Sequence, residues 1–589
     1  MNPNLPPVAP AVTAELVAAL SPRLRKRLDA GAAKLADRPV VRDGDGDTLR
    51  IAIDDDTDLE LHAPGGTVTS AEAIRCGCLL APDCVHRAAA ASAAPVAEPG
   101  AGDTRPEGAA AAGDAGPPEA PDTATPEQCA AAVAVRGAAA AVLEAGIDGA
   151  GAVPQAELLR AAHTARIAGL PRIAAAAVSV VTRLRAARSG DPAHRLAELV
   201  EALRELLGPA HRVPHATGPE LAAVRGTARQ PYTPDGSLRL YGLFSEPVLT
   251  ASGHAGAVTW TADAEGRLYT VSDVLPGGPG RATGAADRSV RIGDTALTHR
   301  ELSRAGLAVS GATVSPTGRL GAGAGVRAVR ASGAAWTAEP LARLWAVPPA
   351  EQAARALATG DGLLFLDVTL TGTVRETGGD CLLADCAGLT LRLTAAHDHP
   401  ALPYRDNLRL LADAPGLRLR VVARLDPAPH ARARLLALSH PSDPEARLDA
   451  GLDRLQRADL PPLSTAPAPV SAAALDDAPL HLLHRRVHQA VSGGRRVLAL
   501  PSTVPADAHR LRRAGLATGA DLLTRLHARA ATRDRDAFGR LLPTDPTHFA
   551  DAWLAAATYT AEVDCALCAA AWGADGPAAT FAPEADVGT

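Results

Sequence analysis

The spacing of apolar residues changes along the chain, and each spacing predicts a different kind of element. Leucines recur at every fourth position within residues 11–38, which predicts an amphipathic helix that ends before Pro39. These leucines are Leu16, Leu20, Leu24 and Leu28. Apolar and polar residues then alternate in two short runs, Thr48–Ile53 and Leu59–His62, which predicts two strands that pair as a hairpin.

Helical spacing returns in two longer segments. Residues 127–212 predict a unit of three or four helices, and residues 475–572 predict a second helical unit. Residues 94–126 consist mainly of Ala, Pro, Gly, Asp and Glu, so they have little apolar surface to bury and predict a disordered acidic linker. Residues 461–475 predict a second linker, rich in Pro and Ala.

Two regions between the helical units are typical of β-structure. The first, from about Tyr232 to residue 335, contains short alternating runs separated by Asp-Gly or Glu-Gly. The second, at about residues 362–440, predicts five strands with a helix near Arg405–Ala412. The strands are expected at Leu363–Val374, Cys381–Ala384, Leu389–Leu393, Leu417–Leu425 and Ala431–Leu438. This order of strand, hairpin, helix and hairpin resembles an OB-fold barrel, and it is equally typical of a generic small β-barrel or sandwich.

The densest group of metal-ligating side chains lies in residues 76–86, which read Cys-Gly-Cys-Leu-Leu-Ala-Pro-Asp-Cys-Val-His. Three thiolates and one imidazole are the ligand set of a closed tetrahedral Zn²⁺ site. They are Cys76, Cys78, Cys84 and His86. The two residues of C-x-C point to the same side of a strand, and the run after the histidine is a strong helix former. The motif therefore predicts one structural zinc per chain, holding a hairpin to the first turn of a helix.

The pattern C-x-C-x5-C-x-H resembles the SWIM zinc finger, in which C-x-C is followed by a variable gap and C-x-H. The resemblance covers roughly residues 40–92, and all four ligand positions match. It implies zinc binding and a role in contacting DNA or protein, since SWIM fingers are appended to ATPases, transposases and kinases as interaction modules.

Together the elements predict a multidomain α+β protein, because 589 residues are too many for one core. The expected parts are a small zinc-bound ββα finger with an N-terminal helix, a disordered linker, a helical module, a β-rich domain, a second β-unit with the OB-like order, and an Arg-rich helical C-terminal module. Their expected bounds are 1–93, 94–126, 127–215, 230–340, 360–445 and 475–575.

Charge is segregated along the chain, although the total of −6 gives no overall attraction to nucleic acid. Residues 481–541 carry twelve arginines and four aspartates, a formal charge of +8, so the remainder is about −14. Such segregation is typical of a surface for nucleic acid or for an acidic partner. A solvated helical face, enlarged by the Arg-rich composition of a GC-rich genome, explains it equally well.

Other groupings favour structural roles. Asp43, Asp45 and Asp47 resemble the start of an EF-hand loop, but Thr48 stands where the sharp turn needs glycine. The histidines at 481, 484 and 488 share one helical face without a further ligand, and the C-x-x-C at 565–568 lies within a helical stretch.

Because the chain has no nucleophile elbow, H-E-x-x-H or Walker motif, we expect no enzyme activity.

These observations predict a zinc-binding adaptor or recognition subunit that uses its finger to bind protein partners. The alternative is a nucleic-acid-binding protein that contacts DNA or RNA through the finger, the second β-unit or the basic C-terminal helices. Residues 1–92 carry ten basic and thirteen acidic side chains, which favours a protein partner for the finger.

The cysteines suggest no disulfide framework, and neither a signal peptide nor a membrane helix is recognised, so a reducing cytoplasm is expected, with no membrane partner.

Overall fold

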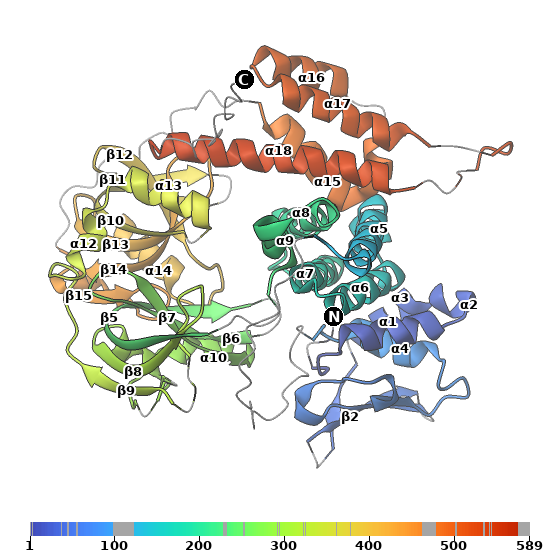
Figure 1. Cartoon of the computed structure of the whole chain (residues 1–589), viewed down its shortest axis with the longest axis horizontal. Helices are drawn as coiled ribbons and strands as arrows, with labels where there is room; N and C mark the ends of the chain where they lie inside the picture. Colours follow the sequence, from blue (N-terminus) through green and yellow to red (C-terminus); the bar gives the residue numbers. More distant parts are fainter. Residues whose placement is uncertain are drawn as a thin grey trace, which may run out of the picture. The chain divides into compact units, whose positions relative to one another are not determined.

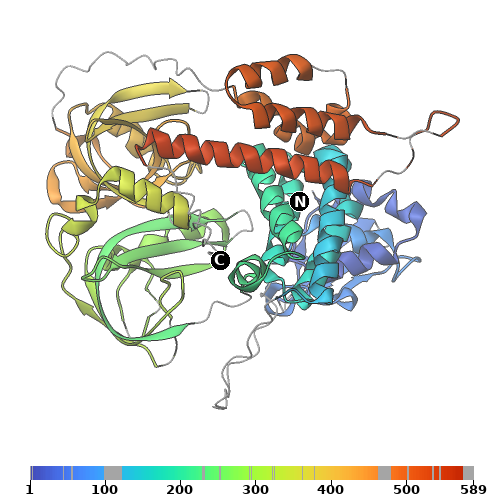
Figure 2. The same cartoon turned by 45° about the horizontal axis from the view of Figure 1, so that its top comes forward.

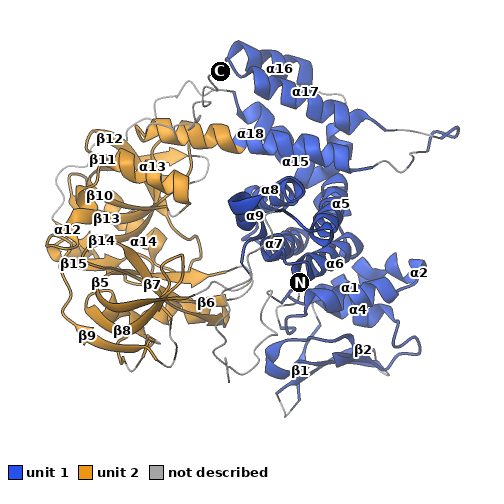
Figure 3. Cartoon of the chain, viewed as in Figure 1, with its two compact units in different colours: residues 1–229, 478–560 blue, residues 230–477, 561–589 orange. Residues whose placement is uncertain are grey.

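The computed structural model describes residues 2–97, 123–227, 232–461 and 479–574, apart from short gaps inside these ranges. The gaps are residues 3, 37, 44–45, 55–56, 251–253, 291, 294, 322, 324, 361, 377–378, 501–502, 534–535, 541 and 543–544. The chain is a mixed α/β protein that divides into two compact units, residues 1–229 with 478–560 and residues 230–477 with 561–589 (Figure 3). The predicted linkers lie largely outside the described residues, and the division into six parts stays a prediction.

The N-terminal segment forms three short helices, so the single helix predicted over residues 11–38 is wrong. They are α1 (Pro10–Ala19), α2 (Pro22–Arg25) and α3 (Leu28–Ala36). The break falls at Ser21, whose backbone is extended because the ring of Pro22 disfavours a helical residue before it. Ser21 instead caps α2, accepting a hydrogen bond from Leu24 N.

The predicted hairpin is confirmed within a four-stranded antiparallel sheet of order β1-β2-β3-β4. Its strands are β1 (Val41–Arg42), β2 (Thr48–Asp54), β3 (Thr57–His62) and β4 (Ile74–Cys76). Opposite pairs such as Leu49 with Leu61 bury the inner face against the N-terminal helices and α4 (Val85–Ala93). Val96, within the predicted acidic linker, is buried and forms a parallel bridge with Val8.

Two helical segments that are distant in sequence share one apolar core in the first unit (Figure 1). The first holds α5 (Pro126–Gly149), α6 (Ala152–Ile167), α7 (Pro171–Arg188), α8 (Leu196–Arg212) and α9 (Gly218–Arg225). The second holds α15 (His481–Leu498), α16 (Val504–Arg513), α17 (Ala517–Ala531) and α18 (Thr547–Ala571), whose residues beyond Thr560 belong to the second unit. Leu143, Leu206 and Trp553 are among the side chains buried in this core.

Helix α5 is the one helix in the described part of the chain that is long and apolar enough to cross a membrane. It packs against α6, α8 and α15, and Val135, Ala139 and Leu143 are buried in their shared core. These contacts are those of a core helix in a folded unit.

The first sheet of the second unit is antiparallel, with the order β7-β6-β5-β8-β9. Its strands are β5 (Thr233–Leu249), β6 (His254–Ala262), β7 (Leu268–Pro276), β8 (Gly306–Val314) and β9 (Arg327–Ala331), with α10 (Gly278–Thr283) and α11 (His299–Leu302) between β7 and β8. The segment before β9 pairs in parallel with β7, since Thr270 N donates to Gly318 O and Leu320 N donates to Thr270 O, each at 2.9 Å.

The second sheet contains the five predicted strands and one more. They are β10 (Leu363–Glu376), β11 (Gly379–Cys386), β12 (Leu389–Ala395), β13 (Arg418–Leu425), β14 (Arg432–His440) and β15 (Asp443–Asp449). Helices α12 (Ala342–Ala346) and α13 (Pro349–Thr359) precede the sheet, and α14 (Tyr404–Ala412) lies between β12 and β13. Neighbouring strands are antiparallel in the order β12-β11-β10-β13-β14-β15, and β12 also pairs in parallel with β14. The strands of this sheet are yellow and orange in Figure 2.

Candidate metal centre

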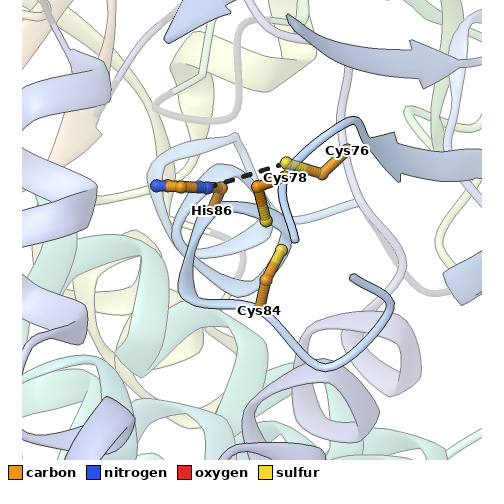
Figure 4. Close-up of side chains that lie close together, drawn as sticks. All are labelled: Cys76, Cys78, Cys84 and His86. Atoms are coloured by element: carbon orange, nitrogen blue, oxygen red, sulfur yellow. Dashed lines mark hydrogen bonds between the residues drawn. The ribbon is translucent and has the colours of Figure 1, made fainter. Parts of the chain in front are cut away.

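The four residues of the predicted zinc motif lie where β4 turns into α4 (Figure 4). Cys76 ends β4, opposite Leu59 of β3, and the chain continues from this strand through Gly77, whose N–H donates to Asp58 O at 3.1 Å. Cys84 occupies the N-cap position of α4, and His86 lies in its first turn. The spacing therefore places Cys76 at the end of a strand, Cys78 in the bend that follows it, and two ligands at the start of a helix.

The ligand atoms converge on one point. The three sulfurs and one imidazole nitrogen of Cys76, Cys78, Cys84 and His86 all lie within 4.8 Å of one another, and Cys76 Sγ is 3.6 Å from His86 Nδ1. A tetrahedral zinc with ordinary bond lengths separates two sulfurs by about 3.8 Å, and a sulfur from a nitrogen by about 3.6 Å. The observed separations suit one metal ion bound among the four side chains.

Burial and crowding act on the three thiols in different ways. Cys84 is 2% exposed, whereas the other ligands are half-buried. Burial raises the pKa of Cys76 to about 12 and also raises the pKa of Cys84. Burial acts in the same sense on Cys78, but the backbone N–H of Leu80 and the neighbouring thiols outweigh it, so the pKa of Cys78 is lowered. A divalent cation would favour the thiolate form of all three and displace their protons.

Arg87, the residue after the last ligand, ties the segments around the site together. Its buried guanidinium donates from Nε to Ile74 O at 2.5 Å, from Nη1 to Pro82 O at 2.6 Å, and from Nη2 to Ala71 O. Two of these carbonyls precede Cys76 and the third lies in the loop before Cys84. Arg87 thus holds the strand end, the loop and the helix in the geometry that brings the ligands together.

The gap between the second and third ligands displays two apolar side chains. Leu79 is 104% exposed and Leu80 is 62% exposed, although leucine is among the residues most often buried. A hydrogen bond from Ala81 N to Cys78 O closes the turn that carries them. Sequence reasoning missed both this exposed pair and Arg87. The arginine could have been recognised as a single charged residue before a run of alanines that pack into the core.

The arrangement suits a structural metal site. Four protein ligands complete a tetrahedral zinc, which leaves no open position for a substrate or an activated water. Three thiolates and one imidazole suit zinc rather than the hard cations that prefer oxygen ligands.

Other groups considered from the sequence form no comparable centre among the described residues, where this cluster is the one set of metal-ligating side chains that converges. His484 and His488 stack at 6.1 Å between ring centroids, and His481 on the same helix is exposed. Cys565 and Cys568 are free thiols. Asp45, in the segment that resembles an EF-hand loop, lies outside the described residues.

Comparison of the chain with protein-family models, with curated proteins and with solved structures found no match.

Proposed function

We propose that the chain is a zinc-binding interaction protein, and that residues 40–92 form a SWIM-type finger that binds protein partners. The observation that carries this proposal is the convergence of Cys76, Cys78, Cys84 and His86 within 4.8 Å. Such a site fixes the relative positions of a strand end and a helix, and it presents the loop between its ligands as a rigid surface.

The partner-binding surface proposed here is the exposed pair Leu79 and Leu80, which we name the zinc loop. Exposed apolar side chains mark interaction sites when they gather in one place. Both leucines lie between two metal ligands, so little conformational entropy is lost when a partner contacts them. The acidic balance of residues 1–92 disfavours phosphate as the partner, and it suits a protein whose apolar pocket has a basic rim.

The test compares Leu79→Ser/Leu80→Ser with Val41→Ser, a control at an exposed apolar position of β1, 61% exposed. Each protein is cross-linked in its native extract, and the captured proteins are identified by mass spectrometry. We expect a specific partner to be retained by the wild type and by Val41→Ser, and to be lost from the double variant while its zinc content stays at one per chain. Partners that do not depend on the leucines would contradict the proposed surface.

We also propose that β10–β14 form an OB-like barrel. The support lies in the pairings: β10 pairs with β11 and β13, β11 with β12, β13 with β14, and β12 runs parallel to β14. This is the strand order 1-2-3-5-4-1 with a helix between the third and fourth strands, as in the OB-fold. The β5–β9 sheet repeats the order, with the segment before β9 in the position that pairs with β7.

The second candidate function, binding of nucleic acid, is favoured by this strand order, because OB-folds commonly bind oligonucleotides. Among the described residues, most aromatic side chains in and beside the two sheets are buried or half-buried, which leaves little ring surface for the stacking that such binding uses. Phe244, Trp336, Trp345 and Phe365 are buried in one core, with Trp260 packed against them half-buried. The adaptor function therefore remains the primary proposal, with the reducing cytoplasm as its expected location because zinc thiolates must stay reduced.

A further inference from the structure

A strongly basic surface lies on the helices that follow the second β-unit in the sequence. Between Arg496, in the last turn of α15, and the end of α17, the chain has six arginines and only two aspartates. Helices α16 and α17 lie side by side as a hairpin (Figures 1 and 2), and their apolar sides are buried through Leu511, Leu523 and Leu526. The arginines occupy the opposite, solvent-facing sides.

The arginines of this region separate into two groups. One group has carboxylate partners: Arg485 and Arg486, earlier on α15, approach the buried carboxylate of Asp507, and the exposed Arg512 pairs with Asp521 at 2.7 Å. The other group is exposed and forms no ion pair with a described residue, and we name it the basic surface. It consists of Arg496, Arg510, Arg513, Arg525 and Arg529.

Composition alone does not explain this surface, since arginines elsewhere in the same unit have acidic neighbours. On α8, Arg204 contacts both Glu201 and Glu205, and Glu205 also pairs with Arg172 of α7. A genome that favours arginine codons supplies arginines to all helices, but α16 and α17 together have only two carboxylates, Asp507 and Asp521. Because Asp521 is the one exposed carboxylate on α16 and α17, the basic surface has an excess of positive charge.

An exposed aromatic ring follows the basic surface in the chain. Phe538, beyond the end of α17, is 86% exposed, and the guanidinium carbon of Arg540 lies 5.9 Å from its ring centroid. The turn that presents it is closed by hydrogen bonds between Asp536 and Arg540. An exposed ring beside arginines suits stacking with a nucleobase, which an acidic polypeptide does not offer.

We propose that the basic surface binds the phosphate backbone of single-stranded nucleic acid and that Phe538 stacks on one of its bases. Guanidinium groups suit phosphate because they donate several hydrogen bonds in a fixed plane. The inference goes beyond the proposed adaptor function, and it does not depend on the zinc loop, which lies on different elements of the chain.

The experiment measures fluorescence anisotropy of labelled oligothymidine and oligouridine with the full-length protein, in a salt series from about 50 mM to 200 mM. We expect Arg510→Gln/Arg513→Gln/Arg525→Gln/Arg529→Gln to weaken binding on the order of 100-fold at low salt and to reduce the salt slope by about 3, since each single-strand phosphate contact contributes about 0.7. Phe538→Ala keeps the charge, so we expect about tenfold weaker binding with an unchanged slope. The two oligonucleotides separate DNA from RNA as the preferred ligand.

The matched control is Arg160→Gln/Arg166→Gln/Arg195→Gln/Arg212→Gln, which removes the same charge from exposed positions on or beside α6 and α8. It should leave the affinity and the slope near those of the wild type. Equal losses in both quadruple variants would overturn the proposal, as would no wild-type binding at low salt. Polyglutamate that competes as well as oligonucleotide, with no effect of Phe538→Ala, would instead assign an acidic protein to this surface. If the first quadruple variant loses its helical circular dichroism, Phe538→Ala alone decides the outcome.

Discussion

The proposed finger and the β10–β14 sheet are both built mainly from antiparallel strands, but their elements differ in length and in the side chains at their junctions. In the finger, β4 has three residues and α4 has nine, and four metal-ligating side chains lie at their junction. In the second unit, β10 has fourteen residues and begins with a run of four buried apolar side chains, Leu363–Leu366. Strands of this length bury enough apolar surface to be stable without a metal, whereas very short elements need an additional constraint.

The difference between the two regions predicts which parts of the chain lose stability when the metal is removed. The finger shares its apolar core with α1, α3 and part of α6. Loss of zinc should therefore loosen the junction of β4 and α4 and disturb these contacts, while the sheets of the second unit keep their own cores.

The largest expected effect is that of removing a buried ligand. Cys84→Ser should reduce bound zinc from about one per chain to almost none, because a structural site with three ligands loses most of a binding free energy of about 10–16 kcal/mol. Amide exchange in β4 and α4 should then rise steeply, as it should in the wild type treated with a chelator. Zinc analysis and hydrogen exchange by mass spectrometry measure both effects.

Cys129→Ser is the matched control for this prediction, since Cys129 is a half-buried thiol on α5 that is not a ligand. It should retain zinc and leave amide exchange in the finger unchanged. A loss of protection in β10–β14 on removal of zinc would show that the two regions are not independent.

Local patterns predicted more of this molecule than distant ones. The four candidate metal ligands lie within eleven residues, and each predicted strand of the second β-unit corresponds to an observed strand, because the spacing of side chains within one element determines such features. The leucine spacing did not predict the break at Ser21, although the proline that causes it is visible in the sequence. Leu206 and Trp553 lie in one core, although they are more than three hundred positions apart in the sequence. The spacing of residues within one element does not indicate such a contact.

The sequence also did not indicate which arginines have partners within the fold and which face solvent. The cluster in residues 481–541 was visible from composition, yet its charge count treated all twelve arginines alike. In the structure, Arg495 is 2% exposed and donates hydrogen bonds to backbone carbonyls, while Arg513 is exposed. Only the packing of the helices separates arginines that stabilise the fold from those that face solvent.

An effect of intermediate size is expected from a buried carboxyl group in the second unit. Asp449, at the end of β15, is 1% exposed and accepts a hydrogen bond from Ser303 Oγ at 3.3 Å. Burial, with a contribution from Asp453, raises the pKa of Asp449 to about 6, against the opposing influence of Arg304 and Arg447. An unfolded aspartate has a pKa of about 3.9, so the folded form binds the proton more tightly.

The sign of the pH dependence follows from this difference. The contribution of Asp449 to stability is fully present below about pH 4 and is lost as the pH rises through about 6, with a total on the order of 3 kcal/mol. Asp449→Asn should therefore flatten the pH dependence of urea unfolding in this window, with unfolding of the second unit followed by tryptophan fluorescence. An unchanged slope in the variant would assign the pH dependence to other groups. The exchange rates of the finger amides at pH 7 should be the same in both proteins.

The smallest expected effect tests how far the finger is organised before the metal binds. Arg87→Lys keeps the positive charge, but an ammonium on a flexible stem cannot reproduce the planar fork that reaches the carbonyls of Ala71, Ile74 and Pro82. Groups that orient metal ligands typically contribute tenfold or more to affinity, so we expect zinc affinity to fall by about tenfold, or about 1.4 kcal/mol. Competition with a chromophoric chelator measures this change.

Arg75→Lys on β4 is the control for Arg87→Lys, because Arg75 is exposed and lies just before the first ligand. It should leave zinc affinity unchanged. At saturating zinc, Arg87→Lys should recover the amide protection of α4, since the metal then imposes the geometry that the arginine otherwise maintains. Equal affinities for the two variants would mean that the four ligands alone organise the site.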